Sequence, residues 1–108
     1  MPLSQPALIA IADPSNVVYV SAATAWEIAI KRGLGKLTAP YDLAKEIERL
    51  RFTPLPITVE HALAVESLPP IHNDPFDRLL LAQAMAEKLR FVTRDAVMRE
   101  YGVQLIQA

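Results

Sequence analysis

The stretch VVYVSAATAWEIAIKR, residues 17–32, predicts a short buried strand that passes directly into a helix. Residues 17–21 are a continuous apolar run of the kind found in buried parallel strands. Residues 22–32 predict a helix that is apolar almost all round and is ended by Gly33 and Gly35. Further along the chain, strands continue to alternate with helices. This alternation predicts an α/β fold with a mostly parallel sheet covered by helices on both faces.

The other segments fit the same pattern. Helices are predicted over residues 4–13, 42–51, 58–68, 74–88 and 94–101, and strands over 52–57, 90–93 and 103–106. Two prolines favour an edge position for the strand at 52–57. Because no repeat or linker interrupts the pattern, residues 1–108 are predicted to form a single domain.

The composition excludes several classes of protein. With 52% hydrophobic and 21% charged residues, the chain is globular rather than disordered. A net charge of -1 means that RNA binding would require a local basic patch. The absence of cysteine excludes disulfides, thiolate metal sites and a cysteine nucleophile. Without a membrane-length apolar stretch or a basic leader, the sequence predicts a soluble, cytoplasmic protein.

Three carboxylates stand where apolar residues are expected. Glu27 interrupts AATAWEIAIK, Asp77 lies in FDRLLLAQAMA, and Asp95 follows the strand-like FVT. Sites in open α/β sheets form outside the carboxyl ends of the strands, so these acids can meet at one edge. Two such charges ~4 Å apart repel by about 4 kcal/mol at an effective dielectric of 20. Magnesium or manganese would remove that repulsion, which predicts metal-dependent phosphodiester hydrolysis.

Each acid also has a simpler interpretation. Glu27 has Lys31 four residues later, in the favourable order for a surface ion pair. Asp77 would be the third residue of its helix, where an acid stabilises the helix dipole. Asp95 would cap the helix that follows Thr93.

Several neighbouring residues have structural alternatives as well. Asp74 before Pro75 is typical of a helix N-cap. Ser21 and Thr93 fit strand-end caps better than nucleophiles, because no histidine is placed as their base. The isolated histidines, His61 and His72, favour structural roles over metal binding.

Trp26 is predicted to lie in the core rather than to stack on a ligand. The basic cluster of Lys31, Arg32 and Lys36 is typical of a solvated face. Because it adjoins the predicted acid cluster, it is also a candidate for contacts with phosphate groups.

Three segments resemble PIN-domain proteins, in particular the VapC-like ribonuclease toxins of bacterial toxin–antitoxin pairs. They are SAATAWEIAIKRGLGKL (21–37), LPITVEHALAVESLPPIHNDPFDRLLLAQA (55–84) and FVTRDAVMREYGVQLI (91–106). The resemblance covers nearly the whole chain and implies a three-layer α/β/α sandwich. It further implies an acidic site that binds Mg²⁺ or Mn²⁺ and cuts RNA, and a small antitoxin protein as partner.

The resemblance also implies roles for individual residues. Glu27, Asp77 and Asp95 would be the catalytic acids and metal ligands. The supporting residues at the same site would be Ser21, Thr93 and Asp74. Contacts with RNA phosphates would come from Lys31, Arg32 and Arg78.

One departure from the family pattern bears on activity. Such toxins normally open with an apolar strand that ends in an aspartate, and this sequence has no counterpart of that central strand. A rearranged or swapped homodimer is therefore predicted to complete the sheet. Metal binding and cleavage are predicted to be weakened or lost. The alternatives are an inactive remnant that binds an antitoxin or a full-length toxin, and a truncated reading frame.

Overall fold

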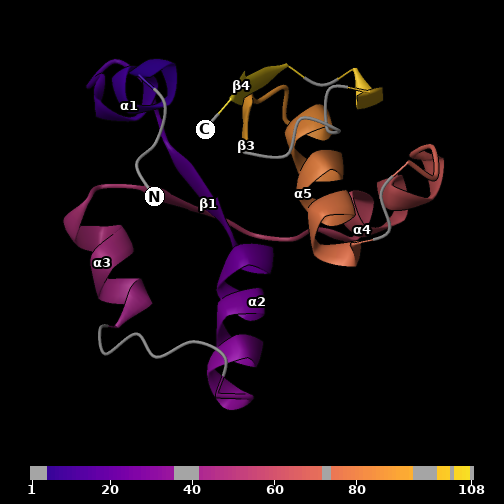
Figure 1. Ribbon diagram of the computed structural model, residues 1–108, viewed down its shortest axis with the longest axis horizontal. Coiled ribbons are helices and arrows are strands. Elements are labelled where there is room, and N and C mark those ends of the chain that lie inside the picture. Colours follow the sequence, from indigo (N-terminus) through magenta and orange to yellow (C-terminus); the bar gives the residue numbers. More distant parts are fainter. Residues whose placement is uncertain (1–4, 36–41, 72–73, 94–99, 103, 108) are drawn as a thin grey trace. The chain divides into compact units, whose positions relative to one another are not determined.

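The computed structural model describes the chain except for residues 1–4, 36–41, 72–73, 94–99, 103 and 108 (Figure 1). It divides into two compact units, which are described separately. The middle unit comprises residues 17–57, and the terminal unit comprises residues 1–16 and 58–108. Among the described helices, none combines the length and apolar character that a membrane span requires.

The middle unit contains one parallel strand pair and two helices. β1 (Tyr19–Ser21) pairs with β2 (Thr53–Leu55), with Tyr19 opposite Thr53. α2 (Ala22–Gly33) follows β1 without a loop, and α3 (Leu43–Arg49) precedes β2. Each helix begins at a polar N-cap, because the side chains of Ser21 and Asp42 accept hydrogen bonds from the first turn.

The terminal unit is built around a pair of contacting helices, α4 (Val59–Ala64) and α5 (Pro75–Ala86) (Figure 1). A 3₁₀ turn, η1 (Val65–Ser67), extends α4. β3 (Phe91–Thr93) follows α5 and pairs in parallel with β4 (Leu105–Gln107). The remaining helix, α1 (Gln5–Ala12), contacts β4.

The core of the terminal unit gathers around α5. Leu81 and Tyr101 are buried there, and the partly buried apolar residues packed against them are Leu68, Phe91 and Leu105. Ala82, Gln83 and Ala84 are buried on the same helix. α5 is therefore the element on which this unit is assembled.

The order of elements predicted from the sequence is confirmed for the described residues. Most of the predicted boundaries differ from the observed ones by one or two residues. The strand predicted from residue 17, for example, begins at Tyr19, and the helix predicted over 58–68 is α4 followed by η1. The described strands form two separate parallel pairs, and each strand is three residues long. The helix predicted over 94–101 lies mostly outside the described residues.

Candidate functional site

Asp74 and Asp77 lie at the N-terminus of α5 and have different surroundings. The Asp74 carboxylate accepts hydrogen bonds from the backbone N–H groups of Phe76 (2.8 Å) and Asp77 (3.4 Å). With Pro75 as the first helical residue, the predicted N-cap is confirmed. Asp77 lies in the first turn and is partly buried, where the positive end of the helix dipole favours its ionised form.

The Arg78 side chain forms hydrogen bonds with the backbone of the segment that precedes α5. Its Nη1 donates to the carbonyl oxygen of Pro69 (3.0 Å), and its Nη2 donates to those of Val65 (3.2 Å) and Leu68 (3.4 Å). A guanidinium that binds carbonyls at a helix C-terminus is favoured by hydrogen bonding and by the helix dipole. The structure thus gives Arg78 a local structural function, while its predicted contact with RNA phosphate stays a prediction.

Glu27 lies on α2 and forms the ion pair that its spacing predicts. Its Oε2 lies 3.5 Å from the Nζ of Lys31, and its side chain is 27% exposed. A carboxylate with this much access to solvent retains acceptor capacity for a cation or a water molecule. The ion pair is therefore compatible with the predicted role in metal binding and does not test it.

The two predicted strand-end residues terminate β1 and β3. The Ser21 hydroxyl is buried and accepts a hydrogen bond from the N–H of Ala23 (3.0 Å), which confirms its capping role. Thr93 is half-buried and lies opposite Gln107 in the parallel register. Both hydroxyls lie where parallel strands end, the position at which α/β folds bind ligands.

The predicted acids are distributed over two units. Glu27 belongs to the middle unit and Asp77 to the terminal unit, and each unit is described by itself. Asp95 lies outside the described residues. Within the part of the chain that the structure describes, no group of three acidic, histidine or cysteine side chains is close enough to hold a metal ion. The convergence of the three acids stays a prediction.

A hollow of about 690 Å³ lies within the middle unit, between α2, α3 and the ends of β1 and β2. Alanines 25 and 29 of α2 line it, together with Ile47 of α3 and Leu55 of β2. Its charged lining residues are Arg32 and Asp42. Sequence analysis missed this hollow, although the small residues spaced four apart on α2 are a usable signal.

Trp26 corrects one prediction. The indole is 59% exposed and not part of the core. α2 directs Ala25 and Ala29 toward the hollow. Trp26 follows Ala25 by one position, which turns it about 100° around the helix axis. The interpretation of Trp26 as a core residue is therefore wrong.

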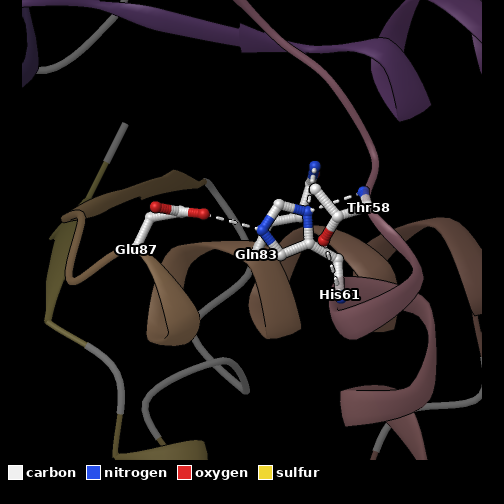
Figure 2. A network of polar contacts seen from close by, with 4 residues as sticks. All are labelled: Thr58, His61, Gln83 and Glu87. Carbon is white, nitrogen blue, oxygen red and sulfur yellow. Dashed lines mark hydrogen bonds and ion pairs between the residues drawn. The ribbon is translucent and has the colours of Figure 1, made fainter.

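His61 has an unexpectedly rich set of polar contacts (Figure 2). The residue is 2% exposed, and its ring contacts Thr58, Gln83 and Glu87. Thr58 and His61 form a capping box, in which each side chain bonds to the backbone of the other residue. The spacing of Thr58 and His61 is that of the standard box, with histidine in place of glutamate or glutamine. That signal supports the structural role expected for His61.

Comparison with known proteins identifies the class. The sequence matches the PIN domain over residues 2–104, nearly its whole length, so the chain belongs to the PIN domain family. Proteins of this family are generally nucleases, and these nucleases use divalent metal ions. The two parallel strand pairs and the surrounding helices are consistent with the PIN fold. The curated proteins that were compared include no match to this sequence.

Proposed function

We propose that the protein is a Mg²⁺- or Mn²⁺-dependent endoribonuclease, the toxin of a toxin–antitoxin pair. The observation that carries this proposal is the position of Asp77 in the first turn of α5, in a chain that belongs to the PIN domain family. Glu27 and Asp95 would be further acids of the nuclease site, as the resemblance to the family implies.

The residues proposed for the site suit a hard divalent cation. Asp77 and Asp95 would hold it with carboxylate oxygens, and the sequence contains no cysteine that would favour a softer metal. When bound, such an ion supplies an activated water molecule and stabilises charge on the phosphate. Glu27 would orient that water molecule, and the hydroxyls of Ser21 and Thr93 would line the site.

The chain's own contribution is to position the acids and the RNA. Asp74 fixes the first turn of α5 and so fixes the backbone that carries Asp77. Arg78 fastens the preceding loop through three carbonyl groups. Lys31 and Arg32, in the last turn of α2, would contact phosphate groups together with Arg78.

The decisive experiment is RNA cleavage in the presence of Mn²⁺ with the Asp77→Asn variant. Asparagine keeps the size of the side chain and removes the charge, so cleavage should fall by at least about 100-fold, with folding preserved. Chelation with EDTA should abolish cleavage by the unsubstituted protein.

Glu60→Gln is the matched control, because Glu60 is an exposed acid of the same unit. This variant should cleave RNA like the unsubstituted protein. Equal cleavage by Asp77→Asn and the unsubstituted protein would contradict the assignment of Asp77.

A second candidate function is a binding module without nuclease activity. Trp26 and Ile30 of α2 and Leu34, the C-cap of that helix, are exposed apolar residues at spacings of four. An exposed apolar stripe of this kind favours a protein partner. In this case the chain would bind a small antitoxin or a second copy of itself. Co-purification with an antitoxin, without Mn²⁺-dependent cleavage of any RNA offered, would favour the module over the nuclease.

A further inference from the structure

The hydrogen bonds of His61 determine where its ring carries a proton. The backbone N–H of Thr58 points at Nδ1, at an N···N distance of 3.1 Å. A backbone N–H can only donate, so Nδ1 is unprotonated and the proton lies on Nε2. Nε2 lies 2.9 Å from Oε1 of Glu87 and donates to that carboxylate (Figure 2). The neutral ring therefore joins the start of α4 to the end of α5.

A second partner for Nδ1 lies in the buried side chain of Gln83. Its Nε2 is 3.4 Å from Nδ1, and the residue is 1% exposed. An amide that turns by half a revolution exchanges its NH₂ donor for an oxygen acceptor at almost the same position. Gln83 can thus face Nδ1 with a donor when the ring is neutral, or with an acceptor when Nδ1 carries a proton.

We propose that His61 is a proton-operated clamp on the N-terminus of α4. In the closed state the neutral ring accepts the Thr58 N–H. In the open state a proton from solvent binds Nδ1, Gln83 turns its oxygen to accept it, and Thr58 loses its acceptor. Glu87 stays bound to Nε2 and compensates the positive charge. Imidazole groups change charge between about pH 5 and 8, so mild acid would drive the transition.

The charged surroundings of the ring are dominated by Glu87. α5 and η1 contact α4. The ionisable residues on these three elements and at the C-terminal end of α5 are Glu60, Glu66, Asp77, Arg78, Glu87 and Lys88. Among the described residues, Glu87 alone forms an ion pair with His61. Proton uptake by the ring is therefore coupled to a single carboxylate, which is half-exposed.

The clamp acts at the point where the chain enters the terminal unit. Thr58 is the first residue of that segment and caps α4. Loss of the bond to Nδ1 leaves an N-terminal donor of the helix without an intramolecular acceptor. The first turn of α4, which carries the exposed Val59, would then open while α5 remains packed.

The test is an NMR titration of ¹⁵N-labelled protein between pH 5 and 8, which follows the His61 ring nitrogens and the exchange protection of the Thr58 amide. We expect the protection factor of Thr58 to fall at least about tenfold in step with protonation of Nδ1. Leu81, in the middle of α5, should keep its protection over the same range. Protonation of Nδ1 with unchanged protection of Thr58 would overturn the proposal, as would a ring that stays neutral down to pH 5.

Two matched variants separate the clamp from general acid destabilisation. Glu87→Gln removes the compensating charge at a half-exposed position, so the Thr58 transition should move to lower pH. Glu60→Gln changes an exposed acid on α4 that does not bind the ring and should leave the transition in place. Equal transitions in both variants would contradict the role of Glu87.

Discussion

At the scale of single residues, the sequence predicts local contacts such as the cap at Asp74 better than it predicts a site that would include Asp77. The cap formed by Asp74 was predictable because its partners, the N–H groups of Phe76 and Asp77, lie two and three positions away. The same holds for Ser21, which caps α2 through Ala23. A metal role for Asp77 stays a prediction, because metal binding depends on residues brought together from distant segments.

The first prediction concerns the Asp74 cap. Asp74→Ala removes the acceptor for two N–H groups of α5 and should lower the free energy of unfolding by about 1 kcal/mol. Urea denaturation followed by circular dichroism measures this change. Asp74→Ser is the control, because serine caps nearly as well and should restore most of the loss. Equal stabilities for the alanine and serine variants would show that the cap does not stabilise α5.

A second prediction concerns pH and the pair of Glu46 and Arg49. Hydrogen bonds from the Arg49 guanidinium, and secondarily its charge, hold the pKa of Glu46 below its ordinary value. The folded-state pKa is thus lower than that of the unfolded chain. The stabilisation is present above the ordinary glutamate pKa of about 4.3 and is lost as the pH falls through the lowered value.

Arg49→Ala should make the free energy of unfolding less dependent on pH in this range. Urea denaturation between pH 3 and 6 would measure the change. Lys45→Ala is a suitable control, because Lys45 is an exposed cation on the same helix. If the two variants lose stability with the same pH profile, the effect belongs to the net charge of the protein and not to this pair.

At the scale of elements, α2 and α5 differ in how they are buried although each has 12 residues. α5 buries four consecutive residues, Leu81–Ala84, whereas α2 buries Ala23 alone among its described residues. Sequence analysis predicted both helices correctly because periodicity and caps are local. It did not predict that Trp26 would face solvent, because that depends on which elements pack beside α2.

The third prediction tests the core on α5. Leu81 is fully buried, so Leu81→Ala should lower the free energy of unfolding by about 2–5 kcal/mol through lost burial and a new cavity. Leu63→Ala on α4 removes the same atoms from a side chain that is 65% exposed, and should cost much less. Urea denaturation of both variants gives the comparison. Similar losses would contradict the assignment of Leu81 to the core.

At the scale of the whole molecule, the strand pairings were only partly predictable. Parallel pairing follows from the alternation of strands and helices, and the described strands confirm it. The partner of each strand could not be derived, because pairing depends on contacts between segments that are far apart in the sequence.

The fourth prediction compares the two units. The described residues that are buried in the middle unit are Ser21 and Ala23, whereas the terminal unit buries larger side chains around Leu81. Amides of α2 should therefore exchange with deuterium at least about tenfold faster, after correction for intrinsic rates, than those of residues 81–84. Hydrogen exchange followed by mass spectrometry measures both. Equal protection would indicate that the chain opens as a single cooperative unit.

The two strand registers also predict the order in which the chain assembles. Pairing Tyr19 with Thr53 closes a loop of roughly 34 residues, whereas pairing Phe91 with Leu105 closes one of roughly 14. Closing the longer loop costs about 0.8 kcal/mol more in free energy, because the entropic cost of loop closure rises with the logarithm of loop length. β3 and β4 should thus meet first during folding, and the transition state should contain their contacts before those of β1 and β2.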